Sequence, residues 1–221
     1  MCRFALVKNL IPEKPQEILN SFSDMAKASR APDGDIQGDG WGVTWRPNNA
    51  WERHSSVKPI WESRIEFSSP PETNLFLIHA RSASFSKDKD NIAYNQPYTN
   101  EKYAFVFNGL LKGMRYPRPL AGDIGAQKIW TLLQEFLDQS STEVAIEKTV
   151  AELNKYAREV QALNLGLSDG EKLYAYCQFT DNANYYTLHA GQSLEKIIVS
   201  SEPLRGKTFS PLKANKLHVF G

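Results

Sequence analysis

The chain has 221 residues, of which 41% are hydrophobic and 23% charged, and these values are typical of a globular protein built as one domain. Its 26 Lys and Arg residues against 25 Asp and Glu residues give a formal net charge of +1. Such an even balance provides no broad positive surface for a phosphate backbone or an anionic membrane, so we expect neither nucleic acid nor a membrane as partner.

Two cysteines are too few for a disulfide framework or a cysteine-built metal site, which favours a reducing, cytoplasmic compartment. No apolar run is long enough to span a membrane, and the first twelve residues lack the apolar stretch of a secretory signal. We therefore expect the N-terminus to be part of the folded protein.

The first half of the chain predicts several strands and one helix. Apolar residues spaced for one helical face predict a helix from about 16 to 29. Residues 46–49, Arg-Pro-Asn-Asn, have the chemistry of a hairpin turn between two of the strands. We predict strands at 3–7, 41–45, 50–54, 74–80 and 102–107. The last of these is followed by Asn108-Gly109, a dipeptide typical of a tight turn.

Helical periodicity dominates the middle of the chain. One apolar stripe runs from Ile129 to Leu137 and a second from Val144 to Val160, with Ser141 or Thr142 as the N-cap of the second helix. Further strands are predicted at 163–167, 172–179, 185–189, 196–200 and 217–220. Strands, then helices, then strands indicate an α+β fold, and without a linker or repeat we assign residues 1–221 to a single domain.

Cys2 is the first candidate for chemistry. Because initiator methionine is commonly removed before a small residue, Cys2 can become N-terminal. Its own α-amine, with an ordinary pKa of about 8, can then take the proton of the thiol, so one residue supplies both nucleophile and base. The alternative is an ordinary small residue at the start of a strand.

Two other segments could contribute to a site. Arg81 follows a predicted strand directly, where its guanidinium could hold a carboxylate through two parallel hydrogen bonds or form a surface salt bridge. Asn108 and Gly109 form either a hairpin turn or an oxyanion hole made of the asparagine amide and the glycine N–H. No carboxylate, histidine or cysteine lies near His79 at a metal-binding spacing, so we predict neither a metal nor a cofactor.

Six segments, taken in their order, resemble the class II glutamine amidotransferases, and most closely the stand-alone type of that family. They are Met1–Phe4, Gly38–Gly42, His79–Ser84, Asn95–Tyr98, Phe105–Gly109 and Ser200–Leu204. The resemblance implies the N-terminal nucleophile hydrolase fold, a four-layer αββα sandwich of two antiparallel sheets between helix layers.

The resemblance also implies a reaction. Mature Cys2 would attack the side-chain amide of glutamine or a related γ-glutamyl compound, and water would hydrolyse the resulting γ-glutamyl thioester to glutamate. The implied catalytic residues are Cys2, Asn108 and Gly109, the last two as the oxyanion hole. Arg81 matches the arginine that holds the substrate α-carboxylate, and Ser84 matches a hydroxyl residue that helps to orient the substrate.

Three positions depart from the family pattern. Gly125 stands where an aspartate usually binds the glutamine α-ammonium, and Asp123, two residues earlier, is the candidate to replace it. Gln96 and Ser82 stand where a histidine and a bulkier residue are common, and we expect both changes to be tolerated.

The missing aspartate keeps two alternatives to a glutaminase open. One is a hydrolase of γ-glutamyl peptides or biosynthetic intermediates, and the other is a non-catalytic binding or regulatory subunit with the same fold. No acceptor domain follows within these 221 residues, so we expect ammonia either to reach a separate synthase subunit or to be released.

Overall fold

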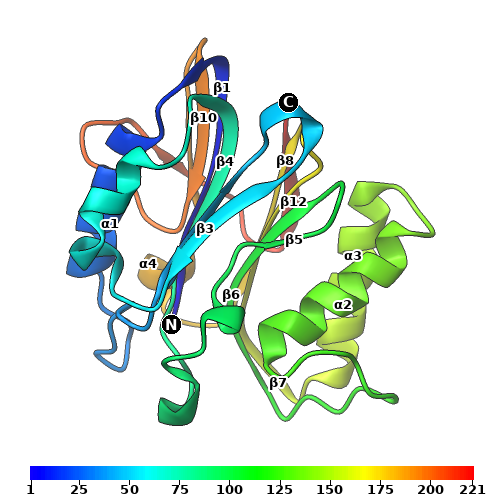
Figure 1. Cartoon of the computed structure of the whole chain (residues 1–221). Helices are drawn as coiled ribbons and strands as arrows, with labels where there is room; N and C mark the ends of the chain where they lie inside the picture. The colour runs from blue at the N-terminus through cyan, green and yellow to red at the C-terminus, as the bar shows by residue number, and fades with distance from the viewer.

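Two antiparallel β-sheets pack face to face in the computed structural model, which describes residues 1–221 (Figure 1). The larger sheet has the order β11-β9-β10-β1-β4-β2-β3, and the smaller has the order β12-β8-β7-β6-β5. The strands of the larger sheet are β1 (Arg3–Glu13), β2 (Trp41–Trp45), β3 (Glu52–Ser56), β4 (Thr73–Ala80), β9 (His189–Gln192), β10 (Lys196–Ser200) and β11 (Ser210–Pro211). Those of the smaller sheet are β5 (Tyr98–Thr99), β6 (Ala104–Lys112), β7 (Glu159–Ser168), β8 (Leu173–Phe179) and β12 (Lys216–Phe220).

Helices cover the outer face of each sheet, as Figure 1 shows. Helix α1 (Gln16–Ala28) packs on the seven-stranded sheet, while α2 (Gly125–Leu137) and α3 (Thr142–Tyr156) pack on the five-stranded sheet. A fourth, short helix, α4 (Ala183–Tyr186), follows β8. The αββα sandwich is confirmed, and none of its helices is long and apolar enough to cross a membrane.

The alternation of side chains along β1 explains how it joins two cores. Ala5 and Val7 pack toward α1, whereas Phe4 and Leu6 face the other sheet. Because both faces are covered, the strand reads as a continuous apolar run rather than as an alternating pattern.

Strand β6 alternates in the same way, and this directs Asn108. Ala104 and Val106 face the seven-stranded sheet, while Phe105 and Phe107 pack against the helices of the other face. Asn108 shares its parity with Val106 and is 1% exposed, so its side chain belongs to the layer between the sheets.

The turn interpretation of Asn108-Gly109 is wrong. Strand β6 continues through both residues to Lys112, and Asn108 pairs with Asn164 of β7. The ladder along β7 overrides the local turn preference, and a Cβ on Gly109 would lie 2.4 Å from the carbonyl oxygen of Ala162. Gly109 is therefore required for the close approach of strands β6 and β7.

Two further expectations are corrected. The strand predicted at 185–189 is the helix α4 followed by β9, because Asn182 adopts a left-handed conformation and Tyr185 and Tyr186 turn inward against Ala31. Val160 belongs to β7 rather than to the preceding helix, which ends at Tyr156.

Several strand boundaries shift, among them those of β6, β7 (Glu159–Ser168 instead of 163–167) and two strands of the larger sheet. Strand β1 runs to Glu13 instead of residue 7, and β3 begins at Glu52 instead of residue 50, because Asn48 and Asn49 adopt positive φ angles and lengthen the turn. The N-cap of α3 is Ser141, whose hydroxyl accepts a hydrogen bond from the Val144 N–H.

Candidate active site

Cys2 lies immediately before β1, at the edge of the layer between the two sheets. Its sulfur accepts a hydrogen bond from the Ser82 N–H at 3.5 Å and lies 3.6 Å from the Ser82 carbonyl oxygen. Arg3 pairs with Ala80 at the end of β4, so the first residues of β1 and the first residues after β4 meet. The sulfur is thereby fixed beside the loop that begins with Arg81.

The start of β1 is anchored by buried polar contacts. Arg3 is 1% exposed, its Nη1 donates to the Tyr185 carbonyl at 2.8 Å, and its Nη2 pairs with Glu202 at 2.5 Å. The hydroxyl of Ser201 accepts from the Phe4 N–H, and the Ser201 N–H donates to the Phe4 carbonyl, both at 3.0 Å. The Ser200–Leu204 segment thus serves to hold the N-terminal strand in place.

Met1 is held by four side chains next to Cys2. Its ammonium donates to Ser82 Oγ at 2.6 Å and to Asp35 Oδ2 at 3.3 Å. Its carbonyl oxygen accepts from Gln37 Nε2 at 3.0 Å and from the Tyr185 hydroxyl at 3.1 Å. Only 15% of the Met1 side chain is exposed, so the folded chain shields the peptide bond that blocks the Cys2 amine.

Burial raises the pKa of the Cys2 thiol, and the N-terminal ammonium, the Ser82 N–H and the charge of Arg81 offset part of this rise. The thiol is therefore protonated at neutral pH, and attack by its sulfur requires a base. Partial burial acts to raise the pKa of Asp35, but the hydrogen bond from Ser82 and the ammonium outweigh it and hold that pKa below its usual range. Asp35 is thus a carboxylate.

The carboxamide of Asn108 has no hydrogen-bond partner in the protein, although both its oxygen and its nitrogen are buried. Buried polar atoms are nearly always paired, and a catalytic or ligand-binding role is one explanation for an unpaired one. The neighbouring Asn164 differs, since its amide donates to the Tyr186 carbonyl at 2.6 Å and its oxygen accepts from the Gln178 N–H at 3.3 Å. An unpaired amide donor at position 108 is available to a ligand.

Packing between the sheets places Asn108 at the level of the N-terminus. A Cβ on Gly166 would lie 2.8 Å from both Leu6 and Val106, which sets those positions opposite one another. Two residues further along β6, Asn108 pairs with Asn164 of β7. Two residues before Asn164, Ala162 of β7 belongs to the cluster on which Met1 packs. Asn108 therefore lies between the level of Leu6 and the level of Met1.

His79 faces the same layer and is uncharged. It pairs with Phe4 across β4 and β1 and is fully buried. Burial lowers the pKa of His79 to about 3, and the nearby charge of Arg81 contributes to this fall. A cationic role for His79 at neutral pH is excluded.

Arg81 is 4% exposed and organises the loop that follows β4. Its Nη1 donates to the carbonyls of Asp39, Lys89 and Asn91 and to Asn95 Oδ1, and its Nη2 donates to the Asp88 carbonyl. All these bonds come from the terminal nitrogens, which leaves the Nε–H for a ligand. Nη2 has a second hydrogen besides the one that it donates to the Asp88 carbonyl, so Nε–H and Nη2 could together bind a carboxylate through two hydrogen bonds.

The structure connects Asp123 to Arg81 but leaves Ser84 apart. The Arg81 guanidinium carbon lies 5.6 Å from the centre of the Tyr94 ring, and the Tyr94 hydroxyl donates to Asp123 Oδ2 at 3.4 Å. Ser84 is exposed in the loop after β4 and makes no side-chain hydrogen bond. Gly125 is the first residue of α2, and a Cβ there would have no neighbour within 4 Å.

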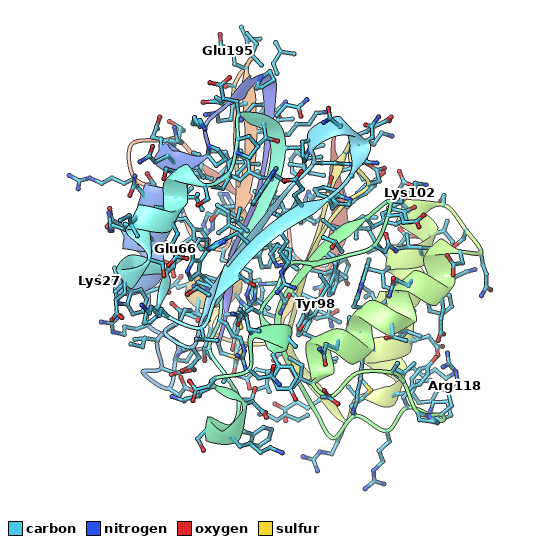
Figure 2. The ribbon with its side chains drawn as sticks, viewed as in Figure 1. Lys27, Glu66, Tyr98, Lys102, Arg118 and Glu195 are labelled. Carbon is cyan, nitrogen blue, oxygen red and sulfur yellow. The ribbon has the colours of Figure 1, made fainter.

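A pocket of about 330 Å³ lies between β5 and the start of α2. Its lining includes Tyr98, which Figure 2 labels in the interior of the molecule. Burial raises the pKa of the Tyr98 phenol, and the negative charge of an ionised Cys2 adds to this rise, which places the two residues within electrostatic range. Cys2, Arg81 and Asn108 are not among the residues that line this pocket.

Four residues of this site were missed as candidates: Asp35, Gln37, Ser82 and Tyr185. Each is a single polar residue, and none has another chemically relevant residue at a spacing typical of a known motif. Together they span about 150 positions of the chain. Only Ser82 carried a signal, because it lies inside the segment that begins with His79.

Comparison with known proteins identifies the family. The model for the class II glutamine amidotransferases matches residues 6–197. None of the curated proteins matches the chain. The matched residues begin after Cys2, so the match does not include that residue.

Solved structures share the fold at low identity. A glutamine aminotransferase class-II domain protein from Silicibacter pomeroyi has a TM-score of 0.67 at 17% identity over 100% of this chain and 95% of its own. Glutamine phosphoribosylpyrophosphate amidotransferase from B. subtilis has 0.69 at 13% over 99% of this chain and 47% of its own. A predicted glutamine amidotransferase from Pseudomonas aeruginosa has 0.56 at 12%, over 99% and 96%. Because the family model covers most of its length, the chain belongs to the class II glutamine amidotransferases.

Proposed function

We propose that the protein is an amidohydrolase in which Cys2, after removal of Met1, cleaves the side-chain amide of glutamine or of a related γ-glutamyl compound. The products are glutamate and ammonia or an amine, formed through a γ-glutamyl thioester. One observation carries the proposal: the sulfur of residue 2 is fixed just before the start of β1, in the same layer as the unpartnered, buried carboxamide of Asn108.

In this mechanism the freed α-amine of Cys2 accepts the thiol proton, because burial keeps the thiol protonated until a base removes it. The thiolate attacks the γ-carbonyl carbon, and the Asn108 amide and the Gly109 N–H donate to the oxyanion. The protonated amine then gives its proton to the leaving nitrogen, and the thioester forms. Water, deprotonated by the same amine, releases glutamate.

Substrate recognition centres on Arg81 in this proposal. Its guanidinium would bind the α-carboxylate through Nε–H and one terminal nitrogen. Ser84 would help to orient the substrate if the loop after β4 folds toward the site. Asp123 is the candidate partner for the α-ammonium, and its link to Arg81 through Tyr94 supports this role.

Gly125 supports a second candidate substrate class. Without an aspartate at this position, free glutamine loses a charge-assisted contact worth about 1.5–3 kcal/mol. Hydrolysis of γ-glutamyl peptides or biosynthetic intermediates, whose α-amine is modified or absent, is therefore the alternative to glutaminase activity. A non-catalytic binding or regulatory subunit would not require the unpaired Asn108 amide.

The fate of the ammonia and the compartment follow as further proposals. We propose delivery of ammonia to a separate synthase subunit, or its release. The free thiols of Cys2 and Cys177 support a reducing, cytoplasmic location.

The test is the intact mass of the purified protein before and after treatment with the glutamine analogue 6-diazo-5-oxo-norleucine. We expect loss of Met1 and one covalent adduct, which Cys2→Ala abolishes and Cys177→Ala retains. A processed protein that stays unlabelled contradicts the glutaminase proposal and favours either γ-glutamyl substrates or the non-catalytic alternative.

A further inference from the structure

Met1 occupies a site that is largely buried but open on the side of Asp35, whose side chain is 43% exposed, and the side chains around it bind each part of the amino acid. Asp35 and Ser82 bind its ammonium, and Gln37 and Tyr185 donate to its carbonyl oxygen. Its side chain packs on the cluster that contains Tyr185 and Tyr186. Gln37 is fully buried, and its own Oε1 has no partner. Such a set of contacts is a binding site for a short, cationic, oxygen-bearing group.

Removal of Met1 leaves these groups without their partners. Gln37 Nε2 keeps only the Tyr185 hydroxyl, at 3.3 Å, and that hydroxyl loses its acceptor. Asp35 keeps its negative charge and the hydrogen bond from Ser82 but loses the Met1 ammonium, and the new N-terminal amine forms one residue further along the chain, at Cys2. Buried donors without an acceptor are unfavourable, so the mature protein favours a replacement that supplies an oxygen and a positive charge.

The position of the site relative to Cys2 indicates which part of a substrate could enter it. The carbonyl carbon of Met1 is bonded to the Cys2 nitrogen, so the site adjoins the amine that becomes free in the mature protein. In the proposed reaction that amine gives its proton to the leaving nitrogen. The leaving group must therefore lie beside the amine, on a side where the Met1 site offers space.

We propose that the space of Met1 is the leaving-group subsite of the mature enzyme. It takes an amine product that carries a second, cationic nitrogen on a short chain, with Asp35 and Ser82 binding the cation. Gln37 and Tyr185 bind an oxygen of the same group. This inference rests on the proposed function, and it assigns as substrate class the γ-glutamyl amides of such amines rather than glutamine, whose leaving group is ammonia.

Binding tests the subsite without requiring activity. Processed Cys2→Ala protein is titrated by calorimetry with L-methioninamide, which has the ammonium, the carbonyl and the side chain of Met1. 4-(Methylsulfanyl)butanamide, which lacks only the α-amine and its charge, is the matched control. We expect the charged probe to bind at least about tenfold more tightly, and Asp35→Asn to remove this difference. Failure of the charged probe to bind, or equal affinity for the two probes, overturns the subsite.

Kinetics test its use in the reaction. The γ-glutamyl amides of 1,3-diaminopropane and of propylamine differ only in the terminal cation. We expect kcat/KM to favour the diamine substrate by about tenfold or more, and Asp35→Asn to bring the ratio close to one. An Asp35→Asn variant that loses activity on both substrates with an unchanged ratio identifies Asp35 as a positioning residue for the Cys2 amine and overturns the subsite.

The two proposals fail in distinguishable ways. Hydrolysis of both amides without preference, together with equal binding of the two probes, leaves the amidohydrolase proposal standing and overturns the subsite. No adduct with the glutamine analogue and no hydrolysis, together with selective binding of the charged probe, overturns the amidohydrolase and retains the binding site.

Discussion

The main chain of Ser82 holds the sulfur of Cys2: its N–H donates to Sγ at 3.5 Å, and its carbonyl oxygen lies 3.6 Å from the same atom. Because these contacts use only backbone atoms, the hydroxyl of Ser82 is free for a second task, and it binds the Met1 ammonium. Ser82 thus links Cys2 to the site that Met1 occupies.

Asn108→Leu should separate catalysis from stability. Loss of one oxyanion donor is expected to lower kcat by about 10²–10³, equivalent to about 2.7–4 kcal/mol of barrier. The free energy of unfolding should stay the same or rise, because the native carboxamide is buried without a partner. Urea denaturation and steady-state kinetics on one preparation measure both effects.

Asn164→Leu is the matched control for that substitution. Its carboxamide is also buried, but it is hydrogen-bonded to Tyr186 and Gln178, so we expect a loss of about 1–3 kcal/mol in unfolding free energy. If Asn108→Leu were destabilised as much as Asn164→Leu, the Asn108 amide would have a structural partner and the oxyanion assignment would fail.

Gly125→Asp should improve the binding of free glutamine. A Cβ at this position meets nothing within 4 Å, so the carboxylate can be added at the start of α2 without a clash. A charge-assisted contact with the α-ammonium is expected to lower KM by about tenfold or more. Gly125→Asn controls for the added bulk, and an equal effect of both substitutions on KM would contradict a charge contact.

Removal of Met1 should precede folding. The Met1 ammonium is bonded to Asp35 and Ser82, and the side chain is 15% exposed, so an aminopeptidase cannot reach this end in the folded protein. We expect purified chains that retain Met1 to resist methionine aminopeptidase when folded and to be cleaved in a denaturant concentration that the peptidase tolerates. Intact mass records the outcome, and rapid cleavage of the folded protein would show that Met1 is not enclosed.

The stability of the protein should fall as the pH decreases below about 6.5. Burial lowers the pKa of His79 from 6.5 to about 3, so the unfolded chain takes up this proton first. The contribution is fully present above pH 6.5 and is lost at about 1.4 kcal/mol per pH unit as the pH falls toward the folded pKa.

His79→Leu provides the comparison for this pH dependence. It removes the titrating group. The change of unfolding free energy with pH between pH 6 and 4.5 should therefore become smaller by about 1.4 kcal/mol per pH unit, which corresponds to one proton. Urea denaturation at several pH values measures both slopes. Identical slopes in the two proteins would mean that His79 is not the group that titrates.

Local sequence patterns were sufficient for much of the fold. The spacing of apolar residues located α1, α2 and α3, because a helix that covers a sheet must show its 3.6-residue period in the sequence itself. The position of Cys2 as second residue likewise needed no structure. What identified it as a candidate was the chemistry of an amine next to its own thiol.

Tertiary structure decided the rest. Asn108-Gly109 has the sequence of a turn, and only the pairing of β6 with β7 keeps it in a strand with its amide directed between the sheets. The partners of Met1 come from positions 35, 37, 82 and 185, which no local pattern connects. Burial and ladder pairing depend on segments distant in sequence. The proposed pairing of amine and thiol in residue 2 therefore follows from the sequence, whereas the unpaired Asn108 amide and the contacts of Met1 arise only when the two sheets pack.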